Sequence, residues 1–484
     1  MNMLVGWQSR TTPQCDQHAM TDEDALDVQR RPDRAAATPQ RLLEGPLLGT
    51  ITRLAAPNAI GAIAQISASV IQMHFVGMLG VDVLAGVTLV FPCLSLMQLV
   101  ATGGIGVGVA SAVARGLGAE RRADAEALVL NAIVLAVAFG ILFATMEVLF
   151  GPTLYRLLGG TGAAFAASLA YANWVFGSAV FVWIVNLLVS ALVGSGHTIV
   201  SQVVSLFWLV VMVSLSPALM FGWGPMPRLG IAGAGLAFAC YYVVATTLLI
   251  GYLRSGRAPL KLQFDVRLIQ LRLMRQIMQV GALSALGVAI PVLSLTLVTS
   301  AVARFGVNVV AGYGLATRTD FLLLPLYIGL CAGVLPMVGA NVGAGQIGRA
   351  RRIAWSGALI ASCIGGIAAL FLALVPSAWL RLFSNDPVVV ASGSLYFRIA
   401  AIHFPFTALA IVLGAAANGA GRPSWPFAAA IARAVVSGGG SWLVVTGTGG
   451  QLETLFAVLA IAGVFQCGVM IAGQILGRTI PDCS

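Results

Sequence analysis

Residues 80–126 read GVDVLAGVTLVFPCLSLMQLVATGGIGVGVASAVARGLGAERRADAE, and residues 306–351 read GVNVVAGYGLATRTDFLLLPLYIGLCAGVLPMVGANVGAGQIGRAR. Each copy has a short polar turn, a long apolar helix, and a Gly-Ala element followed by arginines. Gly80 maps onto Gly306 at a spacing of 226 residues (306 − 80), and Gly118 maps onto Gly343 at 225 (343 − 118). Self-similarity at a fixed spacing is the signature of an internal repeat. The chain is therefore predicted to be a tandem duplication.

The repeat extends beyond these two stretches. Further residues of the first half recur in the second half at a constant spacing of 225 (421 − 196): Arg156, Tyr171, Gly194 and Gly196 match Arg381, Tyr396, Gly419 and Gly421. A single change of spacing over so long a span makes chance similarity an unlikely explanation. The duplication is thus expected to cover two whole lobes.

The composition predicts an all-α polytopic membrane protein. The 484 residues are 59% hydrophobic and only 9% charged, and the mean hydropathy is +0.94. A soluble protein could not cover so much apolar surface. The net charge of +10 comes mostly from arginines in loops beside apolar segments, where they set membrane orientation rather than bind nucleic acid. The 7 cysteines show no metal-like spacing and are read as small apolar residues.

About twenty apolar residues are needed for each crossing, which gives about twelve transmembrane helices in two six-helix repeats. We expect a polar, disordered tail over 1–46, an N-lobe over 47–253, a cytoplasmic linker over 254–277, a C-lobe over 278–476 and a C-terminal tail over 477–484. The expected spans are 50–78, 84–114, 125–150, 165–192, 200–222 and 231–253, then 278–303, 309–340, 352–375, 393–417, 424–446 and 453–476.

The arginines predict the orientation. Arg115, Arg121 and Arg122 follow the second helix, and further arginines lie in the linker and after the eighth helix, whereas the alternate loops carry few. By the positive-inside rule both termini are cytoplasmic. Because each repeat has an even number of helices, the two repeats are parallel. The linker stretch 261–281 is read either as an interfacial helix leading into the seventh span or as a plain connector.

Three expected helices each carry a polar stripe. At about 100° per residue, positions i, i+4, i+7, i+11 and i+14 share a face. Such stripes indicate a water-filled cavity, and the alternative for any single Ser or Thr is ordinary interhelical hydrogen bonding. The stripes are Asn58, Gln65, Ser69 and Gln72; Tyr313, Thr317, Asp320 and Tyr327; and Tyr396, His403, Thr407 and Asn418.

Asp320 is the strongest candidate for an ion-coupling site. Apart from Glu147, near the end of the third span, it is the one carboxylate placed within a span, and His403 lies at comparable depth. The pKa values of such buried groups can move into the physiological range. We therefore expect Asp320 to take up a proton with His403 as a helper. The alternative is a permanent ion pair with Arg318, Arg398 or Arg433.

Several stretches resemble the multidrug and toxic compound extrusion (MATE) transporters. They are APNAIGAIAQISASVIQMHFVGMLGVDVLAG, ATRTDFLLLPLYIGLCAGVLPMVGANVGAG and FPFTALAIVLGAAANGAGRP. The resemblance covers nearly all of residues 50–476. It implies a V-shaped pair of lobes that exports organic, commonly cationic compounds in exchange for protons or sodium ions by alternating access. It also implies that Asp320 stands where the family often has an acid, and Asn186 where the fourth helix often has an amide.

The sequence departs from the family at several positions. Gln72 occupies the place of the first-helix aspartate, and Thr407 falls near the place of the tenth-helix acid. His197-Thr198 and Arg422-Pro423 replace a Gly-Asp-Thr motif. Since glutamine cannot take up a proton, any coupling is expected mainly in the C-lobe.

The sequence therefore predicts a secondary active antiporter, not an enzyme, in a bacterial inner membrane. It is expected to act as a monomer in contact with membrane lipid and a small organic substrate, without nucleic acid, metal or cofactor beyond the coupling ion, H⁺ or Na⁺. On this hypothesis a proton weakens the hold of Asp320 on a cationic substrate. The alternative is a lipid-linked oligosaccharide or polyprenol flippase, with Arg53, Arg318 and Arg433 facing a cationic cavity.

Overall fold

The computed structural model of the chain describes residues 42–447 and 450–480; the side chains of Asp320 and Phe321 lie outside this description. Most of the expected N-terminal tail also lies outside it. The first six spans comprise α2 (Leu47–Gly77), α3 (Val81–Leu99) continued by the π-helical η1 (Val100–Gly106) and α4 (Val107–Gly118), α5 (Arg122–Leu157), α6 (Gly162–Gly177) with α7 (Ala179–Gly194), α8 (Thr198–Phe221) and α9 (Ile231–Arg254).

The second half repeats this order of helices. It comprises α10 (Leu271–Val302) with the 3-10 turn η3 (Ala303–Phe305), α11 (Val307–Gly343), α12 (Ile347–Leu374), the short α13 (Pro376–Leu380), α14 (Pro387–Ala400) with α15 (His403–Gly419), α16 (Ser424–Ala434) continued by the π-helical η4 (Val435–Gly439) and α17 (Gly440–Gly447), and α18 (Leu452–Ile475). In the described stretch between the halves, the 3-10 turn η2 (Val266–Leu268) precedes α10.

The prediction of about twelve apolar spans is confirmed. Within the described residues, ten helical segments are long and apolar enough to cross a membrane, and two bent pairs complete the set of twelve. The bends are 50° between α6 and α7 and 59° between α14 and α15. In the linker, residues 271–277 do not form a helix of their own: they are the first turns of α10, which runs straight into the seventh span.

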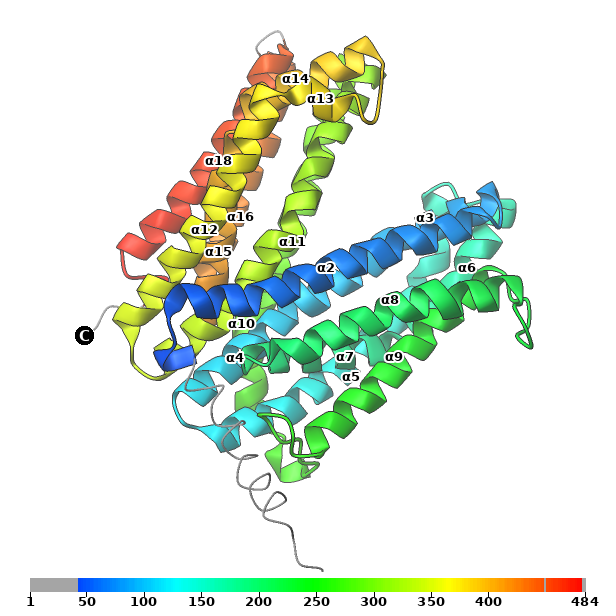
Figure 1. The fold of residues 1–484 in the computed structure, drawn as a ribbon. Helices are drawn as coiled ribbons and strands as arrows, with labels where there is room; N and C mark the ends of the chain where they lie inside the picture. Colours follow the sequence, from blue (N-terminus) through cyan, green and yellow to red (C-terminus); the bar gives the residue numbers. More distant parts are fainter. Residues whose placement is uncertain (1–41, 448–449, 481–484) are drawn as a thin grey trace, which may run out of the picture.

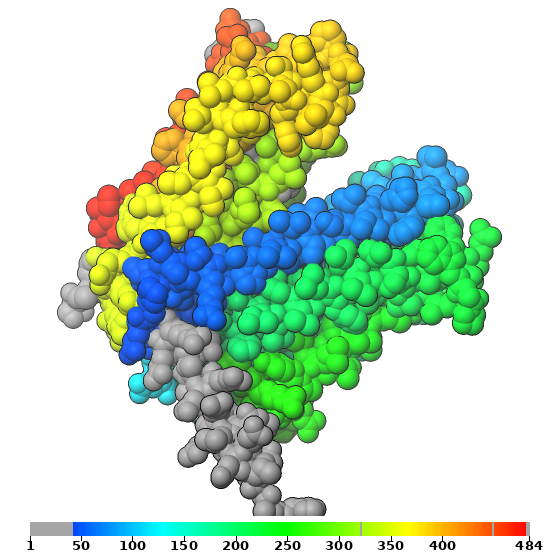
Figure 2. All heavy atoms as spheres, viewed as in Figure 1, coloured from blue at the N-terminus to red at the C-terminus, as the bar shows by residue number. Residues whose placement is uncertain are grey.

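The two halves form the arms of a V (Figure 1). The arms diverge toward the ends that carry α3 and α13, and they meet at the other end, near α4 and α10. The space-filling view shows an open notch between the blue-green arm and the yellow arm (Figure 2). The fold is thus an all-α membrane bundle of two lobes that are in contact at one end.

The first helix of each lobe starts with residues that pack in the core of the other lobe. The early residues Ile51 and Leu54 of α2 belong to the buried core of the second lobe, and Leu273 and Ile277 of α10 belong to the core of the first. Ile51 and Ile277 are repeat equivalents at a spacing of 226 (277 − 51). This reciprocal exchange ties the lobes together where they meet.

Glycines allow the helices to approach closely at this junction. A Cβ placed on Gly118 of α4 would lie 1.9 Å from the carbonyl oxygen of Ala340 in α11, and one on Gly343 would lie 2.3 Å from the carbonyl oxygen of Arg115. Both pairs are related by the spacing of 225 (343 − 118 and 340 − 115). The two copies of the opening sequence stretch therefore meet each other across the pseudo-twofold axis, as expected for parallel repeats.

Candidate functional site

A neutral hydrogen-bond network crosses the interior of the first lobe. Gln98 of α3 donates from Nε2 to the hydroxyl of Tyr242 of α9 at 2.8 Å. Asn186 of α7 donates from Nδ2 to Oε1 of Gln98 at 3.2 Å and to the carbonyl of Val182 at 2.9 Å. The predicted site residue Asn186 thus joins two residues that no polar stripe had marked. The three groups can orient a substrate or a water molecule, but at neutral pH none exchanges a proton readily.

Aromatic side chains surround this network. The ring of Trp208 in α8 lies 4.7 Å from that of Tyr241 and 5.5 Å from that of Phe238, centroid to centroid. Tyr242 lies 4.8 Å from Phe238. Offset and edge-to-face pairs of this kind contribute beyond their buried area. The surroundings of this network are therefore amphipathic, and its three members are uncharged.

The predicted stripe of the first helix divides into two parts. Asn58 accepts a 2.6 Å hydrogen bond from Nε2 of Gln202 in α8, which is ordinary interhelical bonding. Gln65 and Ser69 are exposed, and the hydroxyl of Ser69 donates back to the carbonyl of Gln65 at 3.0 Å. Gln72 is half-buried, and its side-chain amide lies beside the hydroxyl of the buried Tyr171. The stripe remains a prediction for the substrate path, and Gln72 is its buried polar position.

The second lobe gathers four aromatic rings from α11, α14, α15 and α18. Tyr313 lies 5.6 Å from Tyr396, and Phe456 lies 5.3 Å from Tyr396. The ring of His403 lies 6.5 Å from that of Tyr396. His403 is only 3% exposed, and its Nδ1 contacts the carbonyl oxygen of Ala400. The structure thus brings the predicted residues Tyr313, Tyr396 and His403 together in one packed cluster.

Arg433 of α16 is the cation of this interior. One of its Nη atoms donates to the hydroxyl of Thr407 at 3.3 Å and to Oε1 of Gln466 in α18 at 3.0 Å. Thr407 and His403 lie one turn apart on α15 and both face Gly463. Among the residues that the structure describes, the ion pairs join Arg122 to Glu126 and Arg272 to Asp124. Arg433 therefore has neutral hydrogen-bond partners there.

The remaining predicted residues lie on α11. The hydroxyl of Thr317 donates to the carbonyl of Tyr313 at 3.1 Å, within the helix. Tyr327 is buried, and its hydroxyl lies 3.0 Å from a Cβ placed on Gly365 of α12. Asp320 belongs to α11 by its backbone, and its side chain lies outside the described part of the chain. Its coupling role stays a prediction.

Glu147, the other carboxylate placed within a span, is occupied locally. It accepts a hydrogen bond from the hydroxyl of Tyr155, eight residues along α5. A carboxylate held by its own helix is a structural group rather than a candidate for ion exchange between the lobes.

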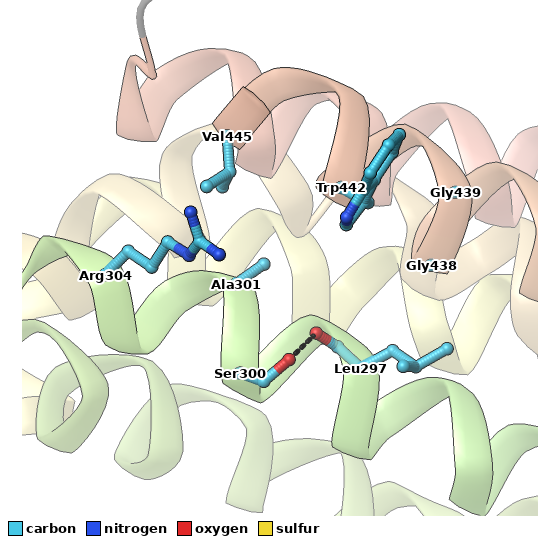
Figure 3. A pocket seen from close by; sticks show the side chains of 8 residues that line it. All are labelled: Leu297, Ser300, Ala301, Arg304, Gly438, Gly439, Trp442 and Val445. Atoms are coloured by element: carbon cyan, nitrogen blue, oxygen red, sulfur yellow. Dashed lines mark hydrogen bonds between the residues drawn. The ribbon is translucent and has the colours of Figure 1, made fainter. Parts of the chain in front are cut away.

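A cavity of about 350 Å³ lies beside the second cluster (Figure 3). Arg304 of η3 and Trp442 of α17 stand on opposite walls. The cavity is lined mainly by small or apolar residues, namely Leu297, Ser300, Ala301, Arg304, Gly438, Gly439, Trp442 and Val445.

Gln98, Tyr242 and Gln466 were missed because their hydrogen-bond partners lie on other spans, which a pattern along one helix does not reveal. The repeat contains a usable signal for Arg433. At the spacing of 225 (433 − 208), Arg433 corresponds to Trp208. The two lobes differ at this position, because one copy of the repeat has a cation where the other has an aromatic residue.

Comparison with known proteins identifies the scaffold. A sequence profile of the MatE family matches residues 57–218 and 284–442. A probable multidrug resistance protein NorM of Deinococcus radiodurans is 28% identical over 462 residues, covering 89% of this chain and 96% of the relative. An FAD transporter of Shewanella oneidensis is 25% identical over 389 residues, covering 79% of this chain and 84% of the relative.

Solved structures share the fold. A MATE transporter in the bent conformation superimposes with a TM-score of 0.82 at 22% identity, over 91% of this chain and 96% of that chain. A MOP superfamily transporter from Pyrococcus furiosus gives 0.80 at 22% identity, over 90% and 96%. Because the family profile covers well over half of the sequence and the V of two six-helix lobes agrees with it, this chain belongs to the MatE family of multidrug and toxic compound extrusion transporters.

Proposed function

We propose that this transporter is an ion-coupled antiporter that exports organic compounds by alternating access between its two lobes. The observation that carries the proposal is the V itself: the lobes meet through paired glycine contacts at one end and diverge at the other. Parallel repeats that rock against each other around a central site are a common basis of alternating access. Relatives described as multidrug proteins support the same function.

The arginine distribution supports an orientation in a bacterial inner membrane with both termini in the cytoplasm. Arg115 and Arg121 lie at the end of α4 where the lobes meet. In that orientation the closed end is cytoplasmic and the open end faces outward. We propose that the chain works as a monomer, because each lobe of the same chain supplies one half of the substrate path, and that it needs no cofactor besides H⁺ or Na⁺.

The hydrogen-bond network in the first lobe is neutral, which supports an ion-coupling site in the second lobe. Gln98, Asn186 and Tyr242 bond to one another there, and Gln72 stands at the place where the family often has an aspartate. We propose Asp320 as the ion-coupling carboxylate and His403 as its helper. A cationic substrate would compete with the ion at Asp320 directly, whereas an anionic substrate would couple through lobe movement alone.

Asp320→Asn tests this assignment. In proteoliposomes with separately imposed proton and sodium gradients, the variant is expected to lose at least tenfold in gradient-driven ethidium or carboxyfluorescein transport. Glu147→Gln is the matched acid-to-amide control, because Glu147 bonds to Tyr155 in the other lobe. Unchanged gradient-driven transport by a monodisperse Asp320→Asn protein would refute the coupling role.

A flippase for lipid-linked oligosaccharides remains the second candidate, and one observation favours it: Arg433 points into the second lobe. Arg53 and Arg318, the other two arginines of that hypothesis, are exposed. A flippase would move a fluorescent polyprenyl phosphate between leaflets without an ion gradient, whereas the antiporter would not.

A further inference from the structure

The charge of Arg433 is costly at its depth. Arg433 lies nine residues after Ser424, the first residue of α16, which places it about 14 Å along a helix that crosses a hydrocarbon layer of about 30 Å. An arginine at such a depth faces a cavity or a partner and usually marks a transport path. Among the residues whose side chains the structure describes, it bonds to Thr407 and Gln466 through one of its nitrogens, and both partners are neutral.

The fold does not need a cation at this position. The repeat equivalent, Trp208, fills the corresponding place in the first lobe and packs edge-to-face against Tyr241 and Phe238. Replacing buried ionic groups by apolar ones is often neutral or stabilising. Retention of an arginine in one lobe is therefore more readily explained by a ligand than by the scaffold.

The backbone after Arg433 is also irregular. The π-helical η4 begins two residues later, at Val435, and such insertions occur frequently at functional sites. Ser437 of η4 donates to the carbonyl of Arg433 at 2.8 Å and shares a 2.7 Å hydrogen bond with Ser294 of α10. These contacts fix the orientation of α16 around Arg433.

The cavity of Figure 3 lies beside the last residues of η4. Its floor is Gly438 and Gly439, five and six residues after Arg433, which corresponds to about 8 Å along the helix. Its walls are apolar apart from Ser300 and Arg304, and Trp442 stands at its edge. An amphiphile of drug-like size fits a cavity of this volume and character.

We propose that the second lobe binds an amphiphilic organic anion, with its carboxylate or phosphate on Arg433 and its apolar part in the cavity beside Gly438 and Gly439. This inference deepens the proposed export function by naming the substrate class, and it rests on that function. Guanidinium binds planar oxyanions through paired hydrogen bonds. The hydroxyl of Thr407 and the amide of Gln466 hold the guanidinium and supply further donors to the same anion.

Equilibrium binding tests the site without requiring transport. The purified full chain is titrated with carboxyfluorescein and with flavin adenine dinucleotide, followed by fluorescence polarisation, and with ethidium as the cationic comparison. Wild type is expected to bind an anionic probe, and Arg433→Gln to weaken that binding at least tenfold. Arg433→Lys is expected to retain part of the affinity, because it keeps the charge and loses the planar fork.

Arg381→Gln is the matched control, since Arg381 is exposed at the end of α13, away from the cluster. It is expected to bind as wild type does. Absence of binding of both anions, tighter binding of ethidium than of either anion, or equal affinity of wild type and a monodisperse Arg433→Gln protein would each overturn the proposal. Displacement of the probe by phosphatidylglycerol in nanodiscs would instead assign the site to lipid headgroups and overturn the assignment to a transported solute.

The two proposals fail separately. Gradient-driven ethidium transport without anion binding refutes the anion site and leaves the exporter. Anion binding that depends on Arg433 without gradient-driven transport of any probe refutes the exporter and leaves the site.

Discussion

At the scale of single residues, His197 makes stability sensitive to pH. It lies between α7 and α8, outside the spans, and its Nε2 lies 3.1 Å from the hydroxyl of Tyr252. Burial lowers the pKa of His197 below its ordinary value of 6.5. The folded protein therefore binds this proton less readily than the unfolded chain does, and the stability that the neutral ring contributes is present above pH 6.5 and lost as the pH falls through the folded pKa.

The expected result is a melting temperature that decreases on acidification below about pH 6.5, with a smaller decrease in His197→Gln. Differential scanning fluorimetry of the two proteins in detergent between pH 7.5 and about pH 5 measures the difference. Parallel curves for wild type and His197→Gln would show that other groups dominate the acid response. The exposed His74→Gln provides the control.

Gln98 supports a second prediction at this scale. Gln98→Leu removes the acceptor of Asn186 and the donor to Tyr242, and it leaves two buried polar groups with fewer partners. Lost bonds of this kind cost about 1–3 kcal/mol each. Thermal unfolding should show the loss, and Thr102→Val, which removes only an exposed bond within its own helix, should not. A Gln98→Leu protein as stable as wild type would mean that water replaces the amide.

At the residue scale, the sequence indicates candidate site residues where polar side chains recur at helical spacing. The stripes on α11 and on the tenth span included Tyr313, Tyr396 and His403, whose rings the structure places in one cluster, and the functional role of these residues stays a prediction. Gln98 and Gln466 were not found in this way, because their hydrogen-bond partners lie on other spans. Only the assembled bundle reveals those pairs.

At the scale of helices, close approach at glycine holds α4 against α11. Gly118→Val would bring a side chain onto the carbonyl of Ala340, since even a Cβ would lie 1.9 Å away. The helices must separate, so we expect a weakened junction between the lobes and increased alkylation of a cysteine introduced at Gln346. Gly77→Val is the control, because nothing lies within 4 Å of a Cβ there. Unchanged labelling in a folded Gly118→Val protein would contradict the tight junction.

Hydropathy located the spans well but not their internal breaks. The tenth and fourth spans were expected as single helices, and each bends by 50° or more. Hydropathy does not register the residues at the breaks: the fourth span breaks at Gly177-Ser178, and the tenth breaks at Ala401, four residues before Pro405, which cannot donate the i→i−4 bond to it. The π-helices η1 and η4 are equally hidden, because an extra residue in one turn leaves the apolar composition unchanged.

At the scale of the whole molecule, the two lobes share a scaffold and differ in chemistry. The duplicated glycines meet as repeat equivalents, which the spacing of the sequence copies had indicated, whereas the V shape was implied by the family resemblance alone. The polar contents are not duplicated: the position that Arg433 occupies in the second lobe is occupied by Trp208 in the first. This division agrees with coupling and substrate binding concentrated in the second lobe.

The junction itself also breaks the symmetry, through Arg115 of α4. Its guanidinium donates to the carbonyl of Gly419, at the end of α15, at 3.2 Å and also contacts Ser111. The hydroxyl of Ser111 bonds to the carbonyls of Asn418 and Gly419. A cation at a helix C-terminus satisfies carbonyls that have no partner within the helix and complements the helix dipole. The repeat equivalent of Arg115 is Ala340 (340 − 115 = 225), so the bond is made from one side only.

Opening of the end where the lobes meet must break these bonds, so in the proposed orientation Arg115→Ala should favour the inward-open state. Bonds from charged donors contribute about 1.5–3 kcal/mol, which corresponds to a population shift of about tenfold or more. Spin labels replacing the exposed Glu120 and Gln346 at the ends of α4 and α11 report the separation by double electron–electron resonance. We expect a longer distance to gain population in Arg115→Ala and not in Arg121→Ala, whose side chain is exposed beside the junction. Identical distance distributions in all three proteins would show that the glycine contacts alone hold the end closed.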